Sequence, residues 1–426
     1  MRSTAHRRSI AVVLGSLFLI SMVTYVDRIN ISVTARQMMP AFGLTDQQMG
    51  HIFSAFVLGY ALFQIPGGRV GDRWGARMVL TGALIWWSLF TGLTAVAAVL
   101  PLANILGIMG SLLVIRFLLG VGEAVALPSF NRAVADWVPH DRQGLGIGIA
   151  IGGIGVGAAV TPPLAAWIMV NWGWQMVFYL SSALGLLVAA IWMCLARYGR
   201  PDERHLSRDN DQRRTVTGCA PAEPVPWRRL VSNAPLRWLV LSYSCLGYVA
   251  YVYMSWFYMY LVNVRGFDVL RGGWFASAPF LAILIFCPLG GWVTDRLVWR
   301  HGVKPGRMVV GMAGMLLAGA MIAIGSAVTS PLLAIAALSL GAGWLYFTVG
   351  AYWASTTDLS KVHAGTLSGV MNTGANIGGA ISPSLTPWLA AEWGWPVALC
   401  VAAVIAALGG LMWLRIDPSE GLTSEV

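Results

Sequence analysis

The sequence predicts an all-α membrane protein with twelve transmembrane helices in two pseudo-symmetric six-helix bundles. Hydrophobic residues make up 57% of the 426 residues and charged residues only 11%, and the mean hydropathy is +0.68. Average soluble chains carry about 25% charged residues, so this composition cannot cover a water-exposed surface. The second half of the chain also repeats motifs of the first half, which indicates a duplicated unit.

The repeat is visible at two places. The segments 144–174 and 365–395 end in the same pattern, and the offset between them is constant. Pro162, Trp167 and Trp172-Gly173-Trp174 in the first segment correspond to Pro383, Trp388 and Trp393-Gly394-Trp395 in the second. A second match, at nearly the same offset, pairs Gly68, Asp72 and Arg73 with Gly291, Asp295 and Arg296. Many transporters consist of two such halves, with the substrate held between them.

Apolar stretches long enough to span a bilayer fall into two sets of six. The first set lies near 10–34, 47–69, 78–98, 106–134, 143–170 and 175–197, and the second near 236–262, 272–298, 307–328, 331–357, 364–390 and 396–415. Polar, aperiodic sequence separates the two sets. The expected organisation is a six-helix bundle over 1–197, a cytoplasmic linker over 198–234 and a second six-helix bundle over 235–426.

The basic residues predict the orientation in the membrane. Most of the 28 lysines and arginines fall on the side of the two termini and the linker, and only Arg36, Arg265 and Arg271 fall in loops on the other side. By the positive-inside rule, we expect a multi-pass protein of the cell (inner) membrane with both termini cytoplasmic. The net charge of +10 then reflects topology, so the expected partners are the lipid bilayer and no nucleic acid.

Several classes of site are not expected. The five cysteines are scattered, and the six histidines lie near predicted span ends or in loops, so neither a disulfide framework nor a metal site is predicted. The sequence has no Walker motif, nucleophile elbow or HExxH motif, so we expect neither ATP-driven transport nor an enzyme. No cofactor is expected beyond a coupling proton.

Four ionisable residues lie inside the apolar spans: Asp27 and Arg28 in the first, Arg116 and Glu123 in the fourth. Each costs on the order of 3 kcal/mol at mid-bilayer, so these side chains must face one another or a wet cavity. Arg116 and Glu123 are two helical turns apart and share one face. One interpretation is a buried ion-pair network that fixes helix packing. The other is an anion site, in which an arginine binds the substrate and a carboxylate loads a cation, most simply a proton.

The motifs around these charges resemble the major facilitator superfamily, and within it the anion:cation symporter family. They are Tyr25-Val26-Asp27-Arg28-Ile29-Asn30, Phe53-Ser54-Ala55-Phe56 with Tyr60 and Gln64-Ile65-Pro66-Gly67-Gly68, the loop from Gly68 to Arg77, and the stretch from Arg116 to Ala124. The resemblance covers nearly all of the chain except the linker and tails. It implies a secondary active transporter that imports a small organic anion, a sugar acid or other carboxylate, with a proton. Carriers of galactonate, hexuronates, glucarate and phthalate have this pattern.

The resemblance also implies residue roles. Arg28 would bind the substrate carboxylate, Asp27 and Glu123 would be the proton-coupling residues, and Arg116 would hold Glu123 ionised until substrate arrives. The expected substrate-binding residues are Arg28, Tyr25, Tyr60, Arg116, Trp353 and Asn372, together with Trp256 from the aromatic seventh span. Asn372 is equally well explained as an interhelical hydrogen bond.

The charged loop after the second span resembles the cytoplasmic signature of the superfamily and predicts a gate. The expected gate residues are Gly68, Asp72, Arg73, Arg77, Asp295 and Arg296. Asp72 would lie at a helix amino terminus of the other half, where the helix dipole favours an anion. The alternative is that these charges only set topology.

Other interpretations stay open. The fifth span has Gly152-Gly153 where some sugar-acid carriers of the family have a glutamine, which weakens the case for a polyhydroxylated substrate. The alternatives are an aromatic-acid or dicarboxylate carrier, a sodium-coupled carrier, or a transporter-like anion sensor. The many glycines of this span predict a close helix approach. We expect a monomer.

Overall fold

The computed structural model describes residues 2–138, 143–198, 230, 232–360 and 364–420, and within them every regular element is helical. The first half contains α1 (Arg2–Phe42), α2 (Asp46–Trp74), α3 (Ala76–Ala95), α4 (Pro101–Glu123), α5 (Ala126–Trp137), α6 (Gln143–Trp172) and α7 (Trp174–Tyr198). The second contains α10 (Ala234–Ser255), α11 (Phe257–Met259), the π-helix η2 (Tyr260–Val264), α12 (Val269–Ala276), α13 (Ala278–His301), α14 (Val303–Ala327), α15 (Pro331–Phe347), α16 (Val349–Leu359), α17 (Ala364–Trp393), α18 (Trp395–Met412) and the 3-10 helix η3 (Trp413–Arg415).

Helices occupy every predicted span. Among the described residues, nine are long and apolar enough to cross a membrane, and a pair bent by 51° (Ala234–Ser255 with Phe257–Val264) makes a tenth. Helices α2 and α17 are as long, with 29 and 30 residues, but they are not among the helices counted. The count of twelve therefore stays a prediction that depends on these two helices.

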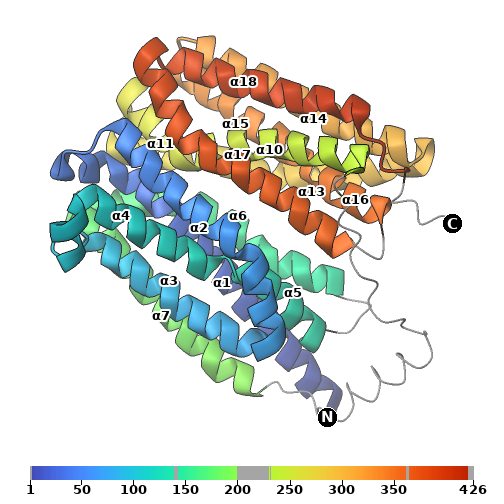
Figure 1. The fold of residues 1–426 in the computed structure, drawn as a ribbon, viewed down its shortest axis with the longest axis horizontal. Coiled ribbons are helices and arrows are strands. Elements are labelled where there is room, and N and C mark those ends of the chain that lie inside the picture. Colours follow the sequence, from blue (N-terminus) through green and yellow to red (C-terminus); the bar gives the residue numbers. More distant parts are fainter. Residues whose placement is uncertain (1, 139–142, 199–229, 231, 361–363, 421–426) are drawn as a thin grey trace.

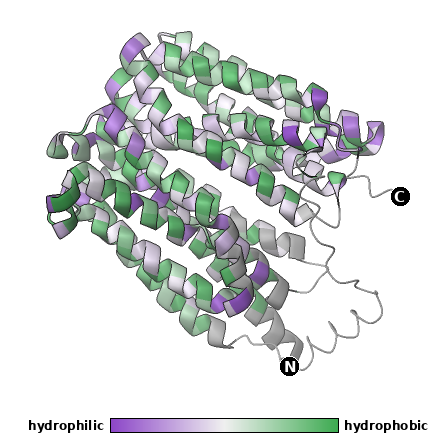
Figure 2. Cartoon of the chain, in the orientation of Figure 1, coloured by the Kyte–Doolittle hydropathy of each residue, from purple (hydrophilic) through white to green (hydrophobic). Residues whose placement is uncertain are grey.

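The helices form two bundles, α1–α7 and α10–α18 (Figure 1). In the first bundle α1 packs on α6, α2 on α4 and α3 on α7, and in the second α10 packs on α17 and α14 on α18. Hydrophobic residues run along the helices, and hydrophilic residues gather mainly at the helix ends (Figure 2). Most of the predicted linker, 198–234, lies outside the described residues.

The sequence repeat is also a repeat in structure. Gly173 joins α6 to α7 and Gly394 joins α17 to α18, each with a φ of +85°, a conformation that favours glycine. The tryptophan pairs before these glycines adopt the same edge-to-face geometry. The ring centroids of Trp167 and Trp172 are 4.9 Å apart, and those of Trp388 and Trp393 are 5.3 Å apart.

Glycines bring the first helix of each bundle against the fifth. A Cβ atom at Gly153 or Gly157 of α6 would collide with the backbone carbonyl oxygens of Phe18 or Met22 of α1. Gly374 and Gly378 of α17 lie as closely against α10. The close approach predicted for the fifth span is confirmed, and it fixes the height of α1, which carries Asp27 and Arg28.

The two bundles meet along two seams, α2 with α17 and α6 with α12 and α13. We call the side on which α1 begins and α18 ends the terminal side. Toward the opposite side, the Ser384 hydroxyl of α17 lies 2.9 Å from His51 Nδ1 and 2.8 Å from Ser54 Oγ, both of α2. Toward the terminal side, α5 and α16 pack on helices of their own bundles and lie apart in Figure 1. The bundles are therefore joined at the opposite side and diverge toward the terminal side.

Candidate functional site

Arg28 of α1 and Glu123 of α4 form a buried ion pair. Arg28 Nε donates to Glu123 Oε2 at 2.7 Å, and the two side chains are 8% and 0% exposed. Glu123 is the last residue of α4, directly before the break that separates α4 from α5. Gly120, one turn earlier, lies against the backbone of α2 at Phe56, so the helices around the pair approach closely.

Three aromatic rings surround the Arg28 guanidinium. Its Cζ lies 5.2 Å from the ring centroid of Tyr25, 5.3 Å from that of Phe56 and 4.4 Å from that of Tyr60. The ring quadrupoles favour a cation at these distances. Arg28 is thus held through Nε and the ring faces, and its side chain, which is 8% exposed, lines a cavity between the bundles.

Asp27 and Arg116 complete the predicted quartet. They are 0% and 1% exposed, and with Glu123 at 0% and the Arg28 side chain at 8% all four charged side chains are largely buried. Arg116 Cζ lies 5.2 Å from the Phe56 ring, which it shares with Arg28. Neither oxygen of Asp27, nor Nε and Nη1 of Arg116, is hydrogen-bonded to a described residue. A buried charge without a partner is costly, which indicates that these atoms acquire partners at another stage.

Two small cavities flank Arg28, each of about 20 Å³. The first lies between the bundles and is lined by Arg28, Ser32, Phe53, Phe56, Val57 and Arg116 and, from α10, by Tyr251, Met254 and Ser255. The second lies on the other side of Arg28 and includes Tyr25, Glu123 and Ile154. Each has room for about one water molecule. Neither of these two cavities has room for an organic anion in this conformation.

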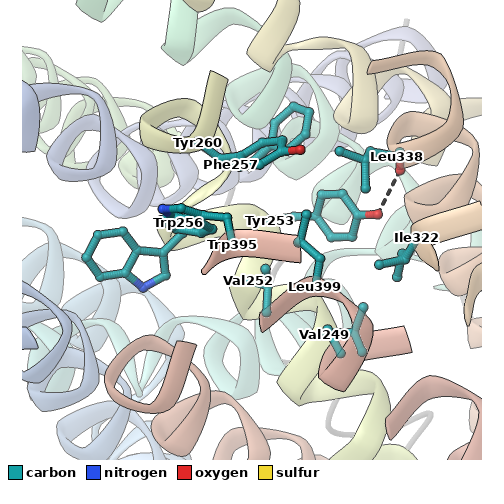
Figure 3. Close-up of a pocket in the computed structure, with 11 residues that line it drawn as sticks. Val249, Val252, Tyr253, Trp256, Phe257, Tyr260, Ile322, Leu338, Trp395 and Leu399 are labelled. Atoms are coloured by element: carbon teal, nitrogen blue, oxygen red, sulfur yellow. Dashed lines mark hydrogen bonds between the residues drawn. The ribbon is translucent and has the colours of Figure 1, made fainter. Parts of the chain in front are cut away.

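The predicted residues of the second bundle lie in other surroundings. Trp256 is 1% exposed, donates from Nε1 to the Pro383 carbonyl at 2.9 Å, and packs edge-to-face on Phe53 across the seam at 5.4 Å. It also lines an apolar pocket inside the second bundle, where the Tyr253 hydroxyl donates to the Leu338 carbonyl at 2.7 Å (Figure 3). Trp256 does not line the cavity of Arg28, and its predicted contact with substrate stays a prediction.

Trp353 and Asn372 make hydrogen bonds to protein groups. Trp353 Nε1 donates to the Tyr243 hydroxyl at 3.0 Å, and the side chain is 43% exposed. Asn372 Nδ2 donates to Gln64 Oε1 of the other bundle at 3.1 Å. The interhelical hydrogen bond considered for Asn372 is therefore present, and its role in substrate binding stays a prediction.

The predicted gate residues make contacts within single bundles. Arg77 Nη2 donates to the Met193 carbonyl of α7 at 3.1 Å, and Arg73 is exposed. Asp295 pairs with Arg307 Nη1 at 2.8 Å, and the Arg296 guanidinium lies 5.7 Å from the Trp292 ring. Gly68 and Asp72 lie in α2, but the surroundings of Gly68 and of the Asp72 side chain are outside what the structure describes. A gate that closes across the bundles stays a prediction.

Three residues of this region were not among the predicted site residues. Phe56 lies against both guanidinium groups, and Gln64 and Asn376 take part in the contact with Asn372. Phe56 and Gln64 stand inside the motifs that carry the resemblance, so they could have been selected there. Asn376 is an amide within an apolar span, and the offset of the Trp-Gly-Trp repeat pairs it with Gly155. This difference between the two halves of the repeat is the sequence feature that could have singled out Asn376.

Comparison with known proteins identifies the family. The model of the Major Facilitator Superfamily matches residues 17–383 and 354–425. The chain belongs to this superfamily. A bacterial homologue of the human lysosomal transporter Spinster, solved in an inward-facing and occupied conformation, superimposes on this superfamily member with a TM-score of 0.77 at 20% identity, covering 97% of this chain and 98% of that one. This likeness shows the fold.

Relatives of this superfamily member are named as anion transporters. A probable sulfoacetate transporter of Cupriavidus necator is 31% identical over 421 residues, covering 95% of this chain and 93% of the relative. The D-galactonate transporter of Escherichia coli is 29% identical over 429 residues, with 96% of each chain covered. A probable chloroplastic anion transporter of Oryza sativa is 28% identical over 398 residues; the match covers 92% of this chain and 66% of that one. The chain is thus a multi-pass membrane transporter and not an enzyme.

Proposed function

We propose that this chain is a secondary active transporter that imports a small organic anion together with a proton by alternating access. The observation that carries the proposal is the Arg28 guanidinium, which is held by Glu123 and three aromatic rings and lines a cavity between the bundles. Guanidinium groups bind carboxylate and sulfonate oxygens through two parallel N–H···O bonds, which supply both energy and geometry. The names of the relatives, with galactonate and sulfoacetate among them, support this substrate class.

Charge balance explains why a proton accompanies the anion. Arg28 and Arg116 balance Asp27 and Glu123, so the empty site is neutral. A bound monoanion adds one negative charge in a poorly solvated place, where an uncompensated charge is costly. When a monoanion is bound, one proton on one carboxylate restores neutrality. When a dianion is bound, both carboxylates must be protonated. We therefore propose one proton per monoanion, with the coupling reciprocal because it is a linkage of two binding equilibria.

The two carboxylates differ in their surroundings. Glu123 keeps the Arg28 Nε bond, whereas Asp27 is fully buried and its two oxygens make no hydrogen bond to a described residue. A carboxylate without donors gains the most from a proton. We propose Asp27 as the group that takes up the coupling proton when a monoanion binds. Glu123 takes up the second proton when a dianion draws Arg28 away from it.

The proposed cycle is a rocking of the two bundles around Arg28. The cavities of about 20 Å³ are too small for an organic anion, so the bundles must separate for binding. We propose that the terminal side is cytoplasmic, in agreement with the basic residues, and that the protein works as a monomer in the cell membrane. The conformation described is then nearly closed, with its helix ends diverging toward the cytoplasm.

Uptake into liposomes tests the proposal. Purified protein is reconstituted, and uptake of labelled galactonate, glucarate, sulfoacetate, a dicarboxylate and an aromatic acid is measured with an imposed pH gradient, with a sodium gradient, and with neither. We expect accumulation of at least one anion driven by the pH gradient, and no electrical current for a monoanion. Accumulation that depends on sodium instead would overturn the proton assignment. Binding without accumulation would favour the anion sensor.

A further inference from the structure

Three amide side chains join the bundles beside the charged site. Gln64 Oε1 of α2 accepts hydrogen bonds from Asn372 Nδ2 at 3.1 Å and from Asn376 Nδ2 at 3.4 Å, both on α17. Asn376 is 6% exposed, and Gln64 and Asn372 are half-buried. One oxygen of the first bundle thus holds two successive turns of a helix from the second.

The amide cluster and the serine contacts bracket Arg28 along the same seam. The Arg28 guanidinium lies against Phe56 and Tyr60 of α2. Gln64 follows Tyr60 by one helical turn toward the terminal side, whereas Ser54, hydrogen-bonded to Ser384, lies nearer the opposite side. Asn372 and Ser384 are separated by about 18 Å at 1.5 Å per residue. The site is therefore closed along α2 and α17 on both of its sides.

The other seam has no amide at the equivalent positions. The sequence offsets pair Asn376 with Gly155 of α6 and Gln64 with Cys287 of α13. There the Leu284 side chain lies so close to Gly155 that a Cβ atom would collide with it. At the equivalent level of the α6–α13 seam, the two bundles therefore pack through apolar groups. Amide side chains are not needed there to bring the bundles into contact.

We propose that Gln64, Asn372 and Asn376 form a cross-bundle latch that closes the Arg28 site toward the terminal side, with Gln64 as the positioning residue that holds both asparagines. This inference rests on the proposed function, because only a carrier needs to open and close the path between an anion site and one side of the membrane. The latch opens when the anion exchanges with the terminal side, and it reforms when the bundles close.

The strength of these bonds suits a latch. Interhelical hydrogen bonds in membrane proteins shift an equilibrium by roughly threefold on average and seldom by more than about twentyfold. Two such bonds favour the closed seam without locking it. The remaining amide atoms, Nε2 of Gln64 and Oδ1 of Asn372, make no hydrogen bond to a described residue. They can therefore exchange partners with water as the seam opens.

Spin-label distances test the latch. Labels are placed at Met78 on α3 and Trp299 on α13, which are 72% and 82% exposed and lie near the terminal-side ends of the two bundles. Distance distributions are measured by pulsed electron resonance in lipid nanodiscs, in a background without native cysteines. We expect Gln64→Leu to raise the ratio of separated to close populations by roughly threefold to twentyfold or more. Adding Asn372→Leu to Gln64→Leu should produce no further change, because its bond is already lost.

Ser384→Ala is the matched control, because it removes hydrogen bonds between the same two helices on the other side of Arg28. It should shift the same distances toward the close population. Asn376→Leu provides a second test if Gln64→Leu does not fold. Unchanged distributions in both latch variants would overturn the proposal. Uptake of galactonate and sulfoacetate by the parental protein is measured in parallel. A shift in the distances without any uptake supports the latch and rejects the proposed carrier function. Uptake without a shift in the distances rejects the latch alone.

Discussion

The guanidinium group of Arg28 donates from Nε to the Glu123 carboxylate, and three aromatic rings surround it. The pair with Glu123 is buried, and buried pairs add little stability relative to apolar packing. The guanidinium groups of Arg28 and Arg116 both lie within 5.3 Å of the Phe56 ring centroid, so one aromatic ring contacts two cations. These details favour a binding role for Arg28 over a role in stability alone.

Arg28→Lys should abolish most transport while keeping the charge. A lysine offers a point charge and cannot present two parallel donors to a carboxylate. Loss of a charge-assisted hydrogen bond costs about 1.5–3 kcal/mol, so we expect apparent affinity for the anion to fall roughly 10- to 100-fold. Uptake kinetics in liposomes measure the change. Uptake with parental KM would place the anion elsewhere.

Asp27→Asn should keep exchange of the anion across the membrane but abolish its accumulation by a pH gradient. The amide is nearly the same size and removes a buried carboxylate that has no hydrogen bond to a described residue, so we expect the melting temperature to stay the same or rise. Anion exchange between the two faces of a liposome should persist, and accumulation driven by a pH gradient should be lost. The idea fails if the variant still concentrates the anion.

At the scale of elements, glycines set the distance between α1 and α6. Gly153 and Gly157 allow the backbones to touch, and Gly374 and Gly378 repeat the contact in the second bundle. Since α1 carries two of the four charges, this packing decides the height at which Arg28 meets Glu123.

Gly157→Ala should destabilise the protein, because its Cβ atom would collide with the Met22 carbonyl and force α1 outward. Overpacking of this kind costs roughly 1–3 kcal/mol. Gly148→Ala on the same helix is the control, because its Cβ atom would meet nothing within 4 Å. Thermal melting in detergent compares the two variants. Equal melting temperatures would mean that the helices adjust freely.

Much of the element level could be predicted from the sequence. The apolar stretches located the helices, and the repeat of Trp172-Gly173-Trp174 at 393–395 marked the same turn in both halves. The breaks after Glu123 and Ser255 were not predicted, because apolar composition continues through them and only backbone geometry shows them. Helices α2 and α17 also occupy predicted spans, although they are not among the described helices counted as able to cross a membrane.

At the scale of the whole molecule, the two bundles are joined on the side opposite the termini and diverge on the terminal side. The Ser54 and Ser384 hydroxyls are 2.8 Å apart across this junction. A rocking mechanism requires the junction to open in every cycle.

A disulfide across the junction should therefore stop transport. Ser54→Cys combined with Ser384→Cys, in a background without native cysteines, replaces two hydroxyls in contact by two thiols, and side chains in contact are the first requirement for a disulfide. We expect oxidation to reduce uptake more than tenfold and a reductant to restore it. Each single cysteine variant is the control. Full uptake by the oxidised double variant would contradict the rocking of this seam.

The site was predictable in part. Charges in apolar spans are costly, so Asp27, Arg28, Arg116 and Glu123 could be selected without a structure, and the structure buries all four side chains. The partners of Asn372 and Trp256 could not be predicted, because these contacts join segments far apart in the sequence or depend on how far the bundles have rocked. Sequence indicates which residues are unusual in a membrane but not which of them meet in a given conformation.

The narrowness of the two spaces beside Arg28 has a mechanical consequence. Each accommodates about one water molecule, so an arriving anion must find room that the closed protein does not have. The space beside Arg28 has to widen in every turnover, and the side chains around it have to move apart. A bulky anion should accordingly require a larger displacement of these side chains than a compact one.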